Sequence, residues 1–323
     1  MKDSALAGEL DQAADREEFR RAVLDGLSRQ PRAIPAKFLY DAHGSELFDA
    51  ICELPEYYLT RTETRILRDN AAEIASLAGP GCALIEFGAG SSVKSRLLLD
   101  AMLDLALYAP IDISRQHLER TAARLRADYP ELSVDPVCAD YMAPASLPSI
   151  GEGARRRVGF FPGSTIGNLV PDEATAFLRA VRSLVGATGA LVLGADLKKD
   201  PRLLHDAYND SAGVTAAFSL NLLRRMNREL QATFDLAGFA HDASYNSAEG
   251  RIEIYLRSLR RQSALIAGHA FAFGEGERIH TEYSYKYDWP AIEAMARRGG
   301  FELARRWTDR DGLFAVAFLK AVP

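Results

Sequence analysis

Residues 84–99 decide the fold, and they read Leu84-Ile85-Glu86-Phe87-Gly88-Ala89-Gly90-Ser91-Ser92-Val93-Lys94-Ser95-Arg96-Leu97-Leu98-Leu99. The apolar run before the glycines is typical of a buried strand, and the residues after Ser92 favour a helix. Glycine allows a sharp turn and a close approach of the backbone to a ligand. In α/β sheets such a strand end binds nucleotides. Val93, however, replaces the last glycine of the dinucleotide pattern G-x-G-x-x-G, so that pattern is absent.

Carboxylates also follow the next two apolar runs. Residues 106–114 contain Asp112 at the end of a second strand, where a carboxylate can hold ribose hydroxyls. Asp112 could instead cap the following helix. Residues 132–139 form a third strand pattern that leads to Asp140. An acidic residue two positions before the first glycine, here Glu86, resembles motif I of the S-adenosylmethionine (SAM) methyltransferases, which commonly bind adenine at the end of the third strand. The spacing therefore favours a SAM methyltransferase.

Composition excludes several classes of protein. The chain has 323 residues and a net charge of -5, which argues against a nucleic-acid partner. Cys52, Cys82 and Cys138 lack metal-ligand spacing, and the six histidines form no H-E-x-x-H motif. Near the N-terminus the chain is charged and has no apolar segment of a signal peptide or membrane span. We therefore expect a cytoplasmic enzyme without a metal, and a monomer is compatible with this sequence.

Alternation of helix and strand patterns over residues 62–196 predicts the βαβ units of a parallel sheet. Strands are expected at 158–161 and 190–195, with a helix at 172–184 between them. The chain ends in paired strand patterns at 301–307 and 312–319, which would complete a seven-stranded sheet.

The remaining segments follow different patterns, namely helices and turns over 11–59 with a break at Pro31 and Pro35, a long helical section over 201–230, and strands near 240–245, 251–259 and 276–287. We therefore predict a Rossmann-like α/β core over 62–196, completed by 287–323. A discontinuous α+β substrate-binding domain would comprise 1–61 and 197–286.

A polar loop, Phe161-Pro162-Gly163-Ser164-Thr165-Ile166-Gly167-Asn168-Leu169, follows the predicted fourth strand. It is not a nucleophile elbow, because Ser164 directly follows Gly163 and the pattern G-x-S-x-G is not met. Asn168 could cap the helix that starts near Pro171. Alternatively, its amide could hydrogen-bond a small polar ligand at the carboxyl edge of the sheet.

Strand-like alternation in residues 278–287 puts Glu282 and Ser284 on one face and Tyr283 and Tyr285 on the other. The simpler interpretation is an exposed polar face over an aromatic core face. A carboxylate beside a hydroxyl would also suit an imidazole, because neutral imidazole needs one acceptor and one donor.

Five blocks together resemble the histidine N-alpha-methyltransferases of ergothioneine biosynthesis, and they lie at residues 34–49, 54–63, 86–90, 162–168 and 281–284. The resemblance extends from about Pro31 to the C-terminus. It implies an enzyme that uses SAM to trimethylate the α-amino group of L-histidine, giving hercynine and S-adenosyl-L-homocysteine. It also implies the two-domain architecture described above.

The resemblance assigns roles to particular residues. Asp112 would hold the ribose, Asp140 the adenine and Lys94 the methionine carboxylate. The full set for the cofactor is Tyr57, Glu86, Gly88, Gly90, Lys94, Asp112, Asp140 and Tyr141. Asn168 and Tyr208 would bind the α-carboxylate and amine of histidine, and Glu282 and Ser284 the imidazole. The full set for the substrate is Tyr40, Gly163, Asn168, Tyr208, Ile254, Glu282 and Ser284, of which Tyr40 and Asn168 are the expected catalytic residues. Ile254 stands where the family usually has methionine.

Two alternatives remain open from the sequence. An enzyme with the same fold and cofactor could methylate another aromatic amino acid, tryptophan or tyrosine. A SAM-binding module could also bind the cofactor and transfer nothing, although the complete set of substrate residues favours catalysis.

Overall fold

The computed structural model describes residues 2–90, 93–142 and 149–322, and the chain divides into two compact units. The core unit comprises 58–200, 247–251 and 284–323, and the accessory unit comprises 1–57, 201–246 and 252–283. Each unit is thus assembled from segments that are distant in the sequence. The assignment of substrate binding to the accessory unit stays a prediction.

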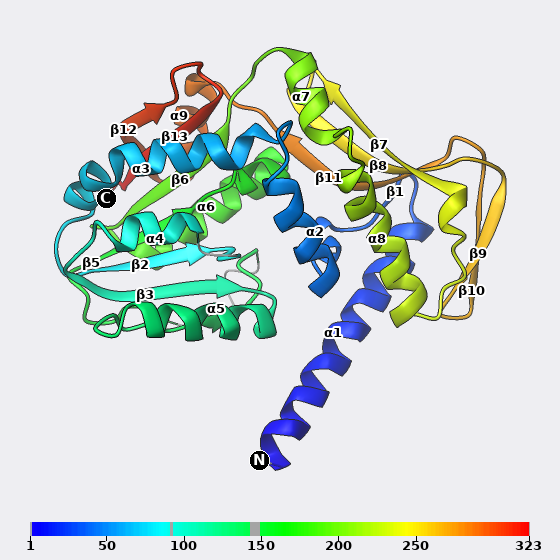
Figure 1. Cartoon of the computed structure of the whole chain (residues 1–323), viewed down its shortest axis with the longest axis horizontal. Coiled ribbons are helices and arrows are strands. Elements are labelled where there is room, and N and C mark those ends of the chain that lie inside the picture. The colour runs from blue at the N-terminus through cyan, green and yellow to red at the C-terminus, as the bar shows by residue number, and fades with distance from the viewer. Residues whose placement is uncertain (1, 91–92, 143–148, 323) are drawn as a thin grey trace. The chain divides into compact units, whose positions relative to one another are not determined.

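The core unit contains a seven-stranded sheet in the order β12-β13-β6-β5-β2-β3-β4 (Figure 1). Strands β3, β2, β5 and β6 are parallel neighbours, whereas β13 runs antiparallel to both β6 and β12. The predicted Rossmann-like fold and the C-terminal strand pair are therefore confirmed. The strands are β2 (Cys82–Phe87), β3 (Leu105–Asp112), β4 (Val137–Cys138), β5 (Arg156–Phe161), β6 (Ala190–Asp196), β12 (Phe301–Thr308) and β13 (Phe314–Ala321).

Helices cover both faces of this sheet, which explains why its central strands are apolar throughout. All six residues of β2 and all seven of β6 are buried. Ile85 and Phe87 pack in the cluster that includes residues of α6 and α9, whereas Glu86 points to Ser95 of α4 on the other face. The helices are α3 (Tyr58–Ala78), α4 (Val93–Leu99), α5 (Arg115–Asp128), α6 (Pro171–Val185) and α9 (Trp289–Arg298).

Strand order reverses at β2, because β3 pairs with one side of it and β5 with the other. In open α/β sheets the carboxyl end of the strands at such a point forms the ligand crevice. The glycine turn after β2 and the polar loop after β5 both lie at that edge.

The accessory unit combines helices with a small mixed sheet of order β1-β11-β8-β7 and a β9–β10 hairpin. In it, α2 packs against α8. Strands β8 and β11 each run over a boundary between the units by a few residues. The elements are α1 (Lys2–Ser28), β1 (Arg32–Ala33), η1 (Ala36–Leu39), α2 (Ala42–Cys52), α7 (Pro201–Tyr208), α8 (Val214–Glu229), η4 (Leu236–Gly238), β7 (Phe239–Asn246), β8 (Arg251–Ser258), β9 (Gln262–Ile266), β10 (His269–Phe273) and β11 (Arg278–Tyr285).

Two local predictions were wrong, and one hairpin was not predicted. The strand expected over 132–139 is reduced to β4 and a bridge between Val134 and Tyr108, since Pro136 cannot donate to a ladder. The helix expected over 201–230 is interrupted, because the Asp210 carboxylate accepts the N–H groups that begin α8. The β9–β10 hairpin was missed, and its turn holds Ala267 and Gly268 at φ 47° and 83°.

Candidate active site

The turn after β2 depends on glycine. Gly88 and Gly90 have φ values of 76° and 46°, in the left-handed region that other residues rarely adopt. The N–H groups of Gly88 and Ala89 donate to the Ile111 carbonyl of β3 at 2.9 and 3.3 Å. A Cβ on Gly88 would lie 3.5 Å from the Tyr141 hydroxyl. The turn therefore brings the backbone close to neighbouring groups without a side chain. Ser91 and Ser92 lie outside the described residues.

Glu86 is buried beneath this turn, and its carboxylate accepts hydrogen bonds from the Ser95 and Tyr108 hydroxyls. Burial raises the pKa of Glu86 to about 7, although these hydrogen bonds act in the opposite direction. The carboxylate thus joins β2 to α4 and β3. Direct contact between Glu86 and the cofactor stays a prediction.

Asp112 and Asp140 follow neighbouring strands at the same edge. The Asp112 carboxylate accepts from the Ser114 N–H at 2.9 Å and lies 3.5 Å from the Gly90 nitrogen. Asp140 accepts from the Met142 N–H at 2.9 Å. The Tyr141 ring packs edge-on against Phe87, with the ring centroids 6.3 Å apart. Asp112 and Tyr141 thus lie beside the glycine turn, and Asp140 follows the neighbouring strand β4.

Lys94 has a partner that was missed in the sequence. Its Nζ lies 2.5 Å from Oε2 of Glu63 on α3, and the Glu63 side chain is only 1% exposed. The same carboxylate accepts from the Gly163 N–H at 3.0 and 2.8 Å. A Cβ on Gly194 would come within 2.0 Å of Glu63 Oε1, so this glycine makes room for the carboxylate. One signal could have found Glu63, because it is an acidic residue on the apolar face of a helix.

The loop after β5 contains two residues at positive φ and continues into a short 3-10 helix. Gly163 and Ser164 have φ values of 80° and 59°, and a short 3-10 helix, η3 (Thr165–Asn168), follows. The Ser164 hydroxyl accepts from the Asp196 N–H at 2.8 Å. Helix α6 is preceded by Val170 as its N-cap residue. Asn168 is therefore not the cap of α6, which removes the simpler interpretation of this residue.

Asp196 is the centre of a buried charged network that was also missed. Its carboxylate accepts from the Tyr58 hydroxyl and forms ion pairs with Lys199 and Lys286. Burial lowers the pKa of Lys199 to about 8, although the nearby Asp196 carboxylate acts in the opposite direction. Lys286 also donates to the Ser284 hydroxyl at 2.9 Å. A predicted substrate residue is thus bonded to the network.

In the accessory unit, Tyr40, Tyr57 and Tyr208 belong to one aromatic cluster. Phe48 packs between Tyr40 and Tyr57, at centroid distances of 5.5 and 6.4 Å, and Tyr57 packs against Tyr208 at 6.1 Å. Burial raises the pKa of Tyr57 well above its usual value, so its hydroxyl stays protonated. The Tyr208 carbonyl accepts from His241 Nε2 at 2.8 Å.

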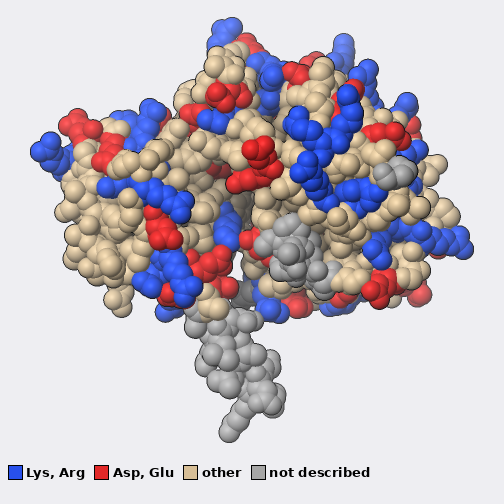
Figure 2. Space-filling view, turned by 180° about the vertical axis from the view of Figure 1, so that it is seen from behind, with Lys and Arg blue, Asp and Glu red and all other residues tan. Residues whose placement is uncertain are grey.

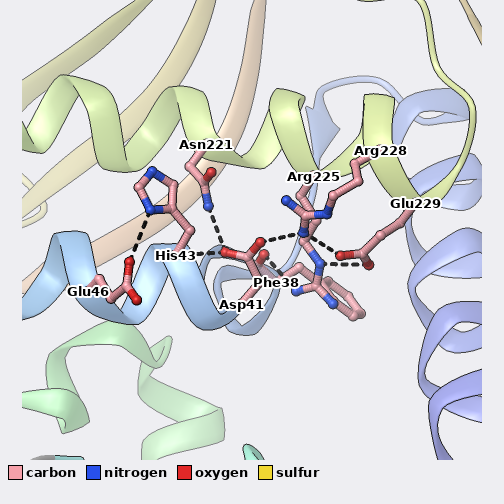
Figure 3. A network of polar contacts seen from close by, with 9 residues as sticks. Phe38, Asp41, His43, Glu46, Asn221, Arg225, Arg228 and Glu229 are labelled. Carbon is pink, nitrogen blue, oxygen red and sulfur yellow. Dashed lines mark hydrogen bonds and ion pairs between the residues drawn. The ribbon is translucent and has the colours of Figure 1, made fainter.

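A polar network anchors the residue that follows Tyr40 (Figure 3). The Asp41 carboxylate accepts from Gly44 N–H at 2.8 Å, from Asn221 at 2.7 Å and from Arg228 at 2.6 Å. Burial opposes ionisation of Asp41, but these hydrogen bonds prevail and lower its pKa. Asp41 thus ties the start of α2 to α8 and restrains the backbone beside Tyr40.

Ile254 and Glu282 lie on the neighbouring strands β8 and β11, where the Thr281 hydroxyl donates to the Ile254 carbonyl at 3.2 Å. Ile254 is buried and Glu282 is partly buried. The predicted substrate residues are divided between the units. Tyr40, Tyr208, Ile254 and Glu282 belong to the accessory unit, and Gly163, Asn168 and Ser284 to the core unit.

Within the described ranges, no group of three or more His, Cys, Asp or Glu residues could hold a metal ion. Among the helices of the described part of the chain, none is long and apolar enough to cross a membrane.

The sheet order, the acidic strand ends and the glycine turn together define a SAM-dependent methyltransferase. A family model described as histidine-specific, SAM-dependent methyltransferase matches residues 19–321. The chain belongs to this family, so it is an enzyme and SAM is its methyl donor. The predictions of family and cofactor are confirmed.

Relatives match nearly the whole chain. Histidine N-alpha-methyltransferase of Mycolicibacterium smegmatis is 42% identical over 319 residues, which cover 97% of this chain and 98% of that protein. Histidine N-alpha-methyltransferase of Mycobacterium tuberculosis is 41% identical over 318 residues, with the same coverage of 97% and 98%. Ergothioneine biosynthesis protein 1 of Neurospora crassa is 31% identical over 288 residues, which cover 86% of this chain and 32% of that protein.

Proposed function

We propose that the enzyme transfers methyl groups from SAM to the α-amino nitrogen of L-histidine until hercynine is formed, as the first step of ergothioneine biosynthesis. The family match and the relatives named histidine N-alpha-methyltransferase support the substrate. The observation that carries the proposal is the Glu63 carboxylate, which binds both Lys94 beside the glycine turn and Gly163 of the loop that ends in Asn168. Through these two interactions, Glu63 connects an expected cofactor residue, Lys94, with an expected substrate residue, Gly163.

The residues of the core unit fit SAM. Gly88 takes a positive φ that disfavours a side chain, so its backbone can approach a ligand closely, and the Asp112 carboxylate beside Gly90 suits a pair of ribose hydroxyls. Lys94 is a cation near the same turn and would hold a carboxylate. When bound, SAM supplies an electrophilic methyl group on its sulfonium.

The protein then has to present the amine of histidine in line with the methyl–sulfur bond. Positioning of this kind supplies roughly 7–11 kcal/mol in favourable cases, so no strong base is required. Asn168 and Tyr208 would hold the α-carboxylate, and hydrogen bonds from Asn168 and Tyr40 would favour the neutral amine. Glu282 and Ser284 would bind the imidazole, with Ile254 beside it.

Trimethylation follows from where the substrate is held. Each transfer turns the neutral amine into an ammonium ion, which must release a proton to water before the next transfer. Fewer N–H groups remain after each step, so a site that completes the series cannot depend on binding all of those protons. Anchors at the carboxylate and the imidazole leave the nitrogen able to turn a new lone pair toward the methyl donor after each step.

We further propose a cytoplasmic enzyme without a nucleic-acid partner, and a monomer is compatible with its sequence. Figure 2 shows Lys and Arg side chains interspersed with Asp and Glu over the face in view. A nucleic-acid site would instead require a continuous basic surface, and the net charge of the whole chain is -5.

Incubation with SAM and a pool of the standard amino acids, followed by mass spectrometry, tests the function. Histidine that gains three methyl groups on its α-nitrogen is the expected product. Methylation of tryptophan or tyrosine instead would assign the enzyme to another substrate. A dimethylated end product, or methylation of the imidazole ring, would refute the proposed anchors.

A further inference from the structure

Asp196, the last residue of β6, is completely buried, and its carboxylate bonds three side chains. Its Oδ2 lies 2.8 Å from Lys286 Nζ and 2.8 Å from the Tyr58 hydroxyl, and Lys199 pairs with Oδ1. The side chains of Lys199 and Lys286 are 6% and 0% exposed. Two buried ammonium groups thus face a single carboxylate, and burial of charge is unfavourable unless each group is well bonded.

Two ammonium groups share one carboxylate, but Lys286 also has a second acceptor. Its Nζ donates to the Ser284 hydroxyl oxygen at 2.9 Å. An ammonium group has three donors and no acceptor. Ser284 Oγ must therefore accept from Lys286, which takes up one of its two lone pairs, and its own O–H points away from the ammonium group. The bond thus favours Ser284 as a donor to further partners.

This direction matters for a neutral imidazole, which has one N–H donor and one nitrogen acceptor. Ionised Glu282 can only accept, so it suits the N–H. A serine held as a donor suits the other ring nitrogen. The pair then favours one tautomer of a neutral ring.

The backbone of Asp196 holds a second part of the expected site. Its N–H donates to the Ser164 hydroxyl at 2.8 Å, and the Ser164 carbonyl accepts from the Gly167 N–H at 2.8 Å. Gly167 lies so close to β11 that a Cβ on it would come within 2.8 Å of the Tyr285 carbonyl oxygen. One buried residue therefore joins the loop that carries Asn168 to the strand that carries Ser284.

We propose that Asp196 and Lys286 are positioning residues for the substrate, which orient the Ser284 hydroxyl as a donor and set its spacing from the loop at 162–168. The proposal rests on the proposed function, in which Ser284 binds the imidazole and Asn168 the carboxylate. Neither Asp196 nor Lys286 is assigned a contact with the substrate.

A double-mutant cycle tests this coupling. Lys286→Met removes the ammonium group and keeps much of the side-chain volume, and it is combined with Ser284→Ala. The matched control is Lys199→Met in the same two backgrounds, because Lys199 is also buried on Asp196 and its side chain bonds Tyr58 rather than Ser284. The measured quantities are kcat and KM for histidine, the affinity for SAM by calorimetry, and the unfolding temperature.

We expect Lys286→Met to lower kcat/KM for histidine about tenfold when Ser284 is present and less than about twofold in Ser284→Ala. Most of the change should appear in KM, and the affinity for SAM should stay within about twofold. Lys199→Met should have the same effect in both backgrounds. If Lys286→Met does not fold, Lys286→Gln replaces it in the double-mutant cycle. Because the glutamine amide can still donate to Ser284, we expect a smaller decrease in kcat/KM for histidine.

Different outcomes separate the two proposals. If Ser284→Ala lowers histidine turnover but Lys286→Met acts equally in both backgrounds, the positioning proposal is overturned and the proposed function stands. Coupling of Lys199→Met to Ser284 as strong as that of Lys286→Met would overturn it as well, since a general loss of packing would then explain both. If Ser284→Ala leaves turnover unchanged, the substrate role of Ser284 and the positioning proposal both fail.

Discussion

The glycine turn at 88–90 and the loop at 162–168 follow neighbouring strands of one sheet, but they are held in different ways. The turn is fixed by backbone hydrogen bonds to the adjacent strand and by glycines at positive φ. The loop is fixed from distant segments, by the Glu63 carboxylate on α3 and by the backbone N–H of Asp196 at the end of β6, which donates to the Ser164 hydroxyl. The conformation of the turn is therefore local, whereas that of the loop depends on buried groups elsewhere in the core unit.

The largest effect is expected where the loop depends on Glu63. Glu63→Ala leaves Lys94 without this carboxylate and the Gly163 N–H without its acceptor, and loss of one partner of a buried pair costs about 3–5 kcal/mol. Denaturant unfolding measures this loss. Glu63→Gln keeps an acceptor for Gly163 and should lose less. A loss below about 1 kcal/mol for Glu63→Ala would show that the loop does not depend on this residue.

The next effect concerns the turn and its cofactor. Asp112→Ala should weaken SAM binding about 30-fold, since loss of charge-assisted hydrogen bonds costs about 2 kcal/mol. Calorimetry measures the affinity, and Asp112→Asn, which still accepts from Ser114, serves as the matched variant. Unchanged affinity in a folded Asp112→Ala protein would contradict the assignment of this residue to the ribose.

Substrate selection should be separable from the cofactor site. Glu282→Ala should lower histidine turnover about tenfold, equivalent to about 1.4 kcal/mol, and leave SAM affinity nearly intact. Glu253→Ala provides a control, because this carboxylate on β8 bonds Tyr255 and Asn246 and has no assigned role in the site. Wild-type activity in Glu282→Ala would contradict the assignment of this carboxylate to the imidazole.

The smallest effect concerns the buried Glu86 carboxylate beneath the turn, and it is seen in the pH dependence of stability. The pKa of Glu86 is raised to about 7 in the folded protein, so the folded state binds more protons than the unfolded state between pH 4.5 and 7. Stability should therefore fall as pH rises through this window, by about 1 kcal/mol between about pH 6 and 7. In Glu86→Gln this part of the slope should be absent. An identical slope in both proteins would show that Glu86 does not titrate in this range.

Much of the core unit could be predicted because its signals are local. The apolar strands, the glycines at 88 and 90, and the carboxylates that follow successive strands are each visible within a short stretch. The C-terminal strands were also predictable from their own pattern. By contrast, Pro136 shortened an expected strand, and the carboxylate of Asp210 ended an expected helix, so single residues overrode a broader pattern.

The missed residues of the candidate site share one property. Glu63 is 31 residues from Lys94 and 100 from Gly163, and Tyr58 is 138 from Asp196. No periodicity in the sequence reports a contact over such separations. The sequence therefore indicated which loops would carry chemistry, but the buried groups that hold those loops became visible only in the fold.

Gly194 shows what this dependence means for redesign. Glycine inside a strand is usually destabilising by roughly 0.5–1 kcal/mol relative to alanine, so position 194 invites a stabilising replacement. The first added carbon would meet Glu63 Oε1 at 2.0 Å and displace the carboxylate from the Gly163 N–H. A variant library built for thermal tolerance could thus lose turnover through a strand position that contacts neither cofactor nor substrate. The space that a side chain at position 194 would fill is occupied by the Glu63 carboxylate, so β6 cannot accept even alanine there without moving that carboxylate.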